Sequence, residues 1–173
     1  MRPHSRQILS VEETFGANSW HCELVEGAEV LRSGFEGHHT RVDLIAQAHP
    51  QLNALSVVTE TPMTITETSR SYVFELLMRA NKPLTLGSFE YDLDREVLVF
   101  RITNLFERER YDADIIASMV HCAIAELDRL VPYVATVRQT APDLLPDLDL
   151  ERLLQRDDLI PPVPDGELEE EEY

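Results

Sequence analysis

The stretch from Tyr72 to Tyr133 decides the fold, because it holds two clear helical patterns with a hairpin pattern between them. It opens with Tyr72-Val-Phe-Glu-Leu-Leu-Met-Arg-Ala-Asn81, an apolar-faced helical run that Asn81 and Pro83 bring to an end. A longer helix is predicted over residues 116–134, where an apolar stripe continues for about five turns. Between the helices, residues 89–102 predict a strand, an acidic turn and a second strand. This order indicates an α+β fold.

The segment before this stretch predicts a short helix and then four strands. Ile8, Val11 and Phe15 share one helical face, and Gly16 stands where a left-handed C-terminal residue costs least. With the hairpin, we expect an antiparallel β-sheet of about six strands, with an N-terminal helix and the two longer helices packed on one side. The four strands are predicted over residues 20–26, 29–36, 41–48 and 52–60.

The last predicted strand is apolar on both faces. Leu98, Phe100 and Ile102 alternate with Val97 and Val99. A strand of this kind is expected to be central in its sheet or covered on both sides.

The C-terminal segment changes in composition. Prolines interrupt it, and residues 143–173 hold twelve acids and two arginines, which accounts for −10 of the formal net charge of −17. The sequence therefore predicts an α+β domain over residues 1–140 and an acidic, proline-broken tail over residues 141–173. We expect the tail to be solvated and to contribute little to folding, with Leu150–Leu154 as the one patch that could dock.

The composition also bears on partners and compartment. A chain with a net charge of −17 and a single lysine, Lys82, repels phosphate backbones, so nucleic acid is not an expected partner. The apolar runs fall short of the roughly 20 residues that a membrane span needs, and the basic N-terminus is not followed by an apolar signal region. Two cysteines are too few for a disulfide scaffold. We therefore expect a cytoplasmic protein without a membrane partner.

Two dipeptides carry residue types that bind metal ions. His21-Cys22 and His121-Cys122 together have the residue types of a Cys₂His₂ zinc site. Neighbouring residues point to opposite faces of a strand, and on a helix they diverge by about 100°. Neither pair therefore converges on one tetrahedral ion, and we expect no metal and no other cofactor.

Two pairs of acids are candidates for catalytic or cation-binding groups. Asp92 and Asp94 fall in the predicted hairpin turn, and Asp112 and Asp114 fall at the start of the long helix, where carboxylates favour the positive end of the helix dipole. The serines lack a nucleophile-elbow setting, and no glycine-rich loop opens a helix. We therefore assign no catalytic residue and expect a protein that is not an enzyme.

The long helix has a second apolar face beside its main stripe. Ile115, Met119 and Cys122 form this face together with Ala125. An apolar face of this kind needs cover, from the rest of the domain, from a second copy or from a client protein. Ile115, Met119 and Cys122 are therefore our candidate partner-binding residues.

Four segments follow one another at a characteristic spacing. They are Arg79-Ala-Asn81, Leu86-Gly-Ser-Phe-Glu-Tyr-Asp92, Glu96-Val-Leu-Val-Phe-Arg101 and Leu127-Asp-Arg-Leu-Val-Pro-Tyr133. In order and spacing they resemble the YbjN family, whose fold is similar to that of type III secretion chaperones, and the resemblance extends more weakly over nearly all of residues 5–137. The turn over residues 92–96 departs from the pattern, since such proteins often have a glycine there.

The leading hypothesis is a non-enzymatic protein-interaction module, chaperone-like or regulatory. The resemblance implies a sensory or regulatory role, and it implies a homodimer because secretion chaperones work as dimers. The apolar surfaces of the last strand and the last helix agree with self-association and with an unidentified protein partner. The alternative is a small-molecule-binding sensor domain or an uncharacterised enzyme with a pocket between sheet and helices, which polar groups converging in one cavity would favour.

Overall fold

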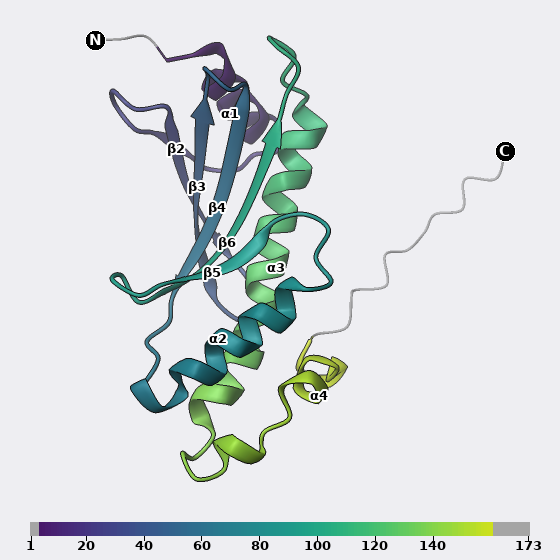
Figure 1. Cartoon of the computed structure of the whole chain (residues 1–173). Helices are drawn as coiled ribbons and strands as arrows, with labels where there is room; N and C mark the ends of the chain where they lie inside the picture. The colour runs from purple at the N-terminus through teal and green to yellow at the C-terminus, as the bar shows by residue number, and fades with distance from the viewer. Residues whose placement is uncertain (1–3, 161–173) are drawn as a thin grey trace, which may run out of the picture.

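Six antiparallel strands form one sheet in the computed structural model, which describes residues 4–160 (Figure 1). The strand order is β1-β2-β3-β4-β6-β5, and α1 and α3 pack against one face of the sheet while α2 packs against α3 and β5. This confirms the predicted α+β class. The elements are α1 (Arg6–Ala17), β1 (Glu23–Leu24), β2 (Val30–Glu36), β3 (Arg41–His49), β4 (Ala54–Pro62), α2 (Glu67–Asn81), β5 (Ser88–Asp92), β6 (Val97–Leu105), α3 (Ala113–Gln139), η1 (Leu145–Asp147), α4 (Leu150–Leu154) and η2 (Asp157–Leu159).

The N-terminal region differs from its prediction in two details. The predicted strand over residues 20–26 is reduced to the two residues of β1, because Trp20 packs edge-on against the rings of Phe15, 5.2 Å away, and Phe35, 5.9 Å away. The left-handed residue after α1 is Ser19 (φ 57°) and not Gly16, which lies inside the helix. The helix runs on because Asn18 caps it, and the Asn18 side chain donates to the Thr14 carbonyl.

The long helix α3 provides most of the cover for the sheet. It packs on β3, β4 and β6, and its buried side chains meet those of the inward-facing strand residues in one core. Thr59 on β4 is fully buried, and its hydroxyl donates to the Ala123 carbonyl of α3 at 2.9 Å. None of the helices within residues 4–160 is both long and apolar enough to cross a membrane.

A buried carboxylate fastens the β2–β3 turn to α3. Asp128 accepts backbone hydrogen bonds from His38 (3.1 Å), His39 (2.8 Å) and Thr40 (3.0 Å). Charge-assisted bonds of this kind satisfy a carboxylate that would otherwise be costly to bury. A Cβ at Gly37 would collide with the Asp128 carboxylate, so the turn approaches the helix closely because residue 37 is glycine.

The two acid pairs have structural roles at turns and helix ends. Asp92 accepts from the backbone N–H groups of Asp94 and Arg95 in the β5–β6 turn, and Glu96 supplies the left-handed residue (φ 52°) of that turn. Asp112 caps α3 by accepting from the N–H groups of Asp114 and Ile115. The turn and cap interpretations are confirmed for these acids.

The described part of the tail docks on the domain. It does so at Leu150–Leu154, the one patch that the sequence offered for docking, and also at Leu145, so the expectation that the rest of the tail is solvated is wrong at Leu145. Leu145, Leu150 and Leu153 are 2%, 5% and 4% exposed and belong to the same core as α2 and α3. The Tyr133 hydroxyl of α3 donates to the Arg156 carbonyl at 3.1 Å. Burial of three leucines offsets the entropy cost that was expected to keep this segment in water. The acidic run at residues 167–172 lies outside the described residues, and the domain boundary at residue 140 stays a prediction.

Replacing Leu153 by Ala should therefore lower the free energy of unfolding by about 2–4 kcal/mol, because it opens a cavity under α4. Leu144→Ala is the matched control, since Leu144 is exposed and its loss should change stability by about 0.5 kcal/mol or less. Urea unfolding measures both. Equal midpoints for Leu153→Ala and the wild type would mean that α4 does not dock in solution.

The chain enters β5 through a position that only glycine suits. Gly87 has a φ of +76°, and a Cβ there would meet the Phe100 ring and lie 2.9 Å from the Arg101 carbonyl oxygen. The Phe100 ring and the Arg101 backbone thus occupy the space that a side chain at residue 87 would need.

Gly87→Ala should destabilise the protein by about 2–4 kcal/mol, the sum of a left-handed alanine and a strained contact with Phe100. Gly16→Ala is the control: it lies in α1 with no atom within 4 Å of an added Cβ, so it should be neutral or stabilising by about 0.5–1 kcal/mol. Thermal or urea unfolding decides the matter, and a Gly87→Ala protein as stable as the wild type would contradict this view of the β5 entry.

Candidate functional site

An open groove lies between the end of β6 and the first half of α3. Its volume is about 370 Å³, and its third wall is Leu86, which precedes β5 and is exposed. We call this surface the edge groove. It is lined by Leu86, Ile102, Thr103, Asn104, Asp114, Ile115, Ser118, Met119 and Cys122.

The edge groove brings together the three partner-binding residues named from the sequence. Ile115 is 43% exposed at the rim, Cys122 is half-buried, and Met119 is 4% exposed and forms part of the floor. They converge because residues four and three apart lie on one face of a helix. Whether they bind a partner stays a prediction.

The sequence analysis missed the wall opposite α3. Ile102, Thr103 and Asn104 of β6 form it together with Leu86. Periodicity assigned Ile102 to the strand, but it gives no information on which residues of another element lie beside a helix face. The sequence held one signal for this wall: the predicted strand after the hairpin turn is longer than the strand before it, so its far end lacks a partner in the hairpin.

The one thiol in the edge groove is protonated at neutral pH. Burial, followed by the nearby Glu126 carboxylate, raises the pKa of Cys122 above its ordinary value. A neutral thiol behaves as a small apolar side chain. Cys122 therefore adds to the apolar lining of the groove, and Asp114 is the carboxylate that lines it.

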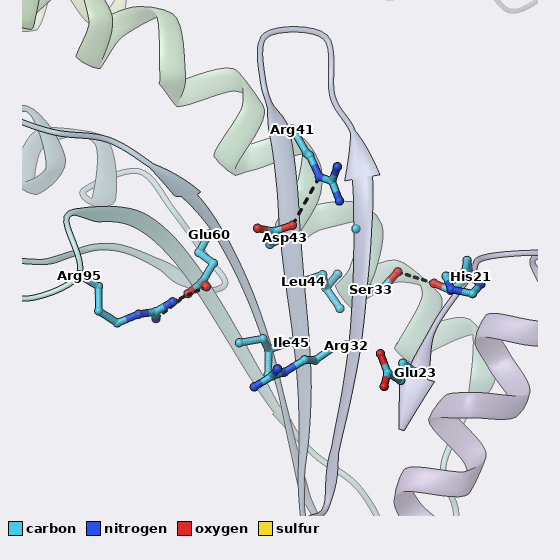
Figure 2. A pocket seen from close by; sticks show the side chains of 11 residues that line it. His21, Glu23, Arg32, Ser33, Arg41, Asp43, Leu44, Ile45, Glu60 and Arg95 are labelled. Carbon is cyan, nitrogen blue, oxygen red and sulfur yellow. Dashed lines mark hydrogen bonds and ion pairs between the residues drawn. The ribbon is translucent and has the colours of Figure 1, made fainter. Parts of the chain in front are cut away.

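A second hollow, of about 430 Å³, lies on the face of the sheet opposite α3 (Figure 2). Here charges of both signs meet: Arg41 lies 3.6 Å from Asp43, and the Arg95 guanidinium forms two hydrogen bonds with Glu60. These arginines are more than half exposed, so each pair contributes about 1 kcal/mol or less. The charged groups of this hollow are satisfied largely by one another, which leaves little net charge to attract a ligand.

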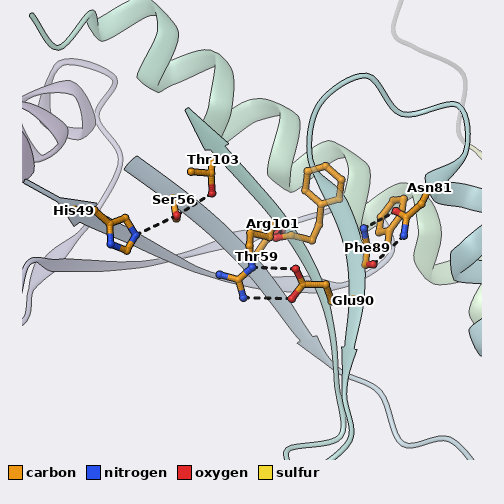
Figure 3. Close-up of polar contacts among 9 residues, drawn as sticks. His49, Ser56, Thr59, Asn81, Phe89, Glu90, Arg101 and Thr103 are labelled. Atoms are coloured by element: carbon orange, nitrogen blue, oxygen red, sulfur yellow. Dashed lines mark hydrogen bonds and ion pairs between the residues drawn. The ribbon is translucent and has the colours of Figure 1, made fainter. Parts of the chain in front are cut away.

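A polar row crosses the same face (Figure 3). The Ser56 hydroxyl lies 3.2 Å from His49 Nε2 and 2.8 Å from the Thr103 hydroxyl. Catalysis by such a pair requires a third group that orients the histidine and donors for an oxyanion. The third member here, Thr103, contacts the serine and not the histidine. The row is therefore a set of cross-strand contacts that stabilises the sheet.

His121 and Cys122 of the second His-Cys pair face different surroundings. His121 packs edge-on against the Trp20 ring at 5.0 Å, whereas Cys122 faces the edge groove. Among residues 4–160 no group of three or more histidine, cysteine or acidic side chains is placed to hold a metal ion.

Comparison with known proteins identifies the fold. No protein-family model matches the sequence, and no curated protein sequence matches it. The crystal structure of YbjN from E. coli is similar, with a TM-score of 0.55 and 8% identity over 72% of this chain and 87% of that chain. The HopA1-SchA chaperone-effector complex gives a TM-score of 0.47 and 11% identity, over 80% of this chain and 100% of that chain. An uncharacterized protein from Methanothermobacter thermautotrophicus gives a TM-score of 0.47 and 14% identity, over 77% of this chain and 96% of that chain. The chain has the fold of YbjN, as the resemblance of its sequence implied.

Proposed function

We propose that this protein is a non-enzymatic protein-interaction module, chaperone-like or regulatory, and that it binds a protein partner in the edge groove. The observation that carries the proposal is the groove itself: an open, mostly apolar surface at the edge of the sheet, with Leu86 and Ile115 exposed at its rim. Apolar surface of this kind gains about 25 cal/mol for each Å² that a partner covers.

The lining favours a protein over a small molecule. Small-molecule sites enclose most of their ligand and orient it with several converging polar groups. The edge groove is open, and its ionisable carboxylate, Asp114, lies on the exposed first turn of α3. The net charge of −17 opposes nucleic acid as the partner.

The proposal includes a homodimer, and the open face of the sheet suits it. Ile45 and Val58 are cross-strand partners at its centre, and Val99 lies nearby on β6. Val99 is 5% exposed although it points away from α3, because the paired side chains of Glu90 and Arg101 flank it. Positively and negatively charged side chains that pair with one another surround these three apolar residues, so two copies can meet there without local repulsion. The edge groove then stays free for a partner.

Ile115→Asp tests the proposal. The change places a charge at the groove rim, and an acid in the first turn of α3 should leave the helix stable because it favours the helix dipole. Leu93→Asp is the matched control: Leu93 is 54% exposed but lies in the β5–β6 turn, at the other end of β6. We expect wild type and Leu93→Asp to capture the same proteins from native cytosol, and Ile115→Asp to capture them at least tenfold less, by quantitative mass spectrometry.

Light scattering should give the same mass for all three proteins, because the proposed dimer uses the other face. The proposal is wrong if Ile115→Asp retains every protein that the wild type retains. A metabolite that stabilises the wild type in a thermal-shift screen but not Ile115→Asp would support the small-molecule alternative instead.

A further inference from the structure

β6 is longer than the strand beside it. β5 pairs with Val97–Arg101, and the remaining residues of β6, Ile102–Leu105, pair with β4 alone among the strands within residues 4–160. One edge of these four residues therefore faces the edge groove. An unpaired edge is a template on which another extended chain can add.

The direction of the backbone groups follows from the register. The Phe106 N–H donates to the Asn53 carbonyl at 2.8 Å, one step beyond the Ala54–Leu105 pair. In an antiparallel ladder the bonding direction alternates from residue to residue. Ile102 and Asn104 therefore point their N–H and C=O groups toward β4. Thr103, which lines the edge groove, and Leu105 point theirs to the opposite side, where β5 is absent.

The outer edge of β5 shows how a side chain of this protein satisfies unpaired backbone groups of a strand. The Asn81 side chain donates to the Phe89 carbonyl at 3.0 Å and accepts from the Phe89 N–H at 2.7 Å, so it occupies the outward backbone groups of β5 (Figure 3). Gly87 then turns the chain away before it can pair with Ile102. No described side chain forms the corresponding bonds with the Thr103 or Leu105 backbone.

We infer that the occupant of the edge groove is an extended peptide segment of the partner, which adds to β6 as a strand. The inference rests on the proposed function and specifies the mode of binding. The N–H and C=O groups of the peptide pair with the backbone of Thr103 and Leu105. Alternate apolar side chains of the peptide enter the edge groove against Ile115 and Met119.

Charge decides which segment fits. The carboxylate of Asp114 lines the groove, and the chain as a whole is strongly acidic. A segment with a lysine or arginine beside its apolar residues is therefore favoured. A second copy of this chain that met this groove with its own would bring a second Asp114 carboxylate to the same place, so it is the less suitable occupant.

The test uses a phage-displayed library of random twelve-residue peptides, selected on the full chain. Thr103→Pro removes the N–H that faces the groove and leaves the bonds from Ile102 and Asn104 to β4 in place, because proline is tolerated at a free strand edge. Thr103→Ala controls for the lost side chain and its contact with Ser56. We expect selected peptides with alternating apolar residues and a basic residue. Their affinity should fall at least tenfold for Thr103→Pro and Ile115→Asp and less than twofold for Thr103→Ala and Leu93→Asp.

A second measurement covers the case in which Thr103→Pro does not fold. Two versions of the tightest-binding peptide are made, one methylated at the odd-numbered backbone nitrogens and one at the even-numbered ones. One version should bind the wild type at least tenfold more weakly than the unmethylated peptide, and the other should bind with little change. Strand addition is overturned if Thr103→Pro binds as tightly as Thr103→Ala, if neither methylated series loses affinity, or if the selection returns no peptide that depends on Ile115. If cytosolic proteins still depend on Ile115 but not on the Thr103 N–H, the proposed function stands and strand addition falls.

Discussion

The packing of α3 on one face of the sheet is the constraint on which the rest of the structure depends. The inward side chains of β4 and β6 are covered chiefly by this helix, and those of β3 by α3 together with α1. The buried Asp128 fixes α3 to the β2–β3 turn by three backbone hydrogen bonds. Because the cover lies on one side, the opposite face must satisfy its own polar groups. It does so with cross-strand contacts such as Arg101–Glu90 and Ser56–Thr103.

The same constraint produces the edge groove. α3 begins at Ala113 and runs beside the last residues of β6, which extend past the first residue of β5. Its Ile115 and Met119 therefore face a stretch of β6 that β5 does not pair with. Gly87 determines where β5 begins, since its left-handed backbone and the Phe100 ring beneath it fix the path of the entering chain. The proposed binding surface is thus a consequence of two strands of unequal length under one helix.

Local sequence patterns predicted much of this architecture, and long-range contacts account for what they missed. The helical stripes, the alternation of β3 and the turn and cap roles of Asp92 and Asp112 are properties of neighbouring residues, and the structure confirms them. Docking of Leu150 and Leu153 depends on surface that α2 and α3 offer from elsewhere in the chain. The role of Asp128 likewise depends on a turn far away in sequence. Ile115, Met119 and Cys122 were found as a helix face, but their opposite wall on β6 was not, because periodicity does not reveal which elements become neighbours.

Amide hydrogen exchange along β6, followed residue by residue by NMR in dilute free protein, tests the central claim most directly. Alternate amides of one strand should differ: those of Ile102 and Asn104, directed at β4, should be strongly protected, and those of Thr103 and Leu105 should exchange orders of magnitude faster. Addition of a bound peptide should slow the fast pair and leave the slow pair unchanged. Equal protection of all four amides in the free protein would show that the edge is already occupied, and would contradict the account.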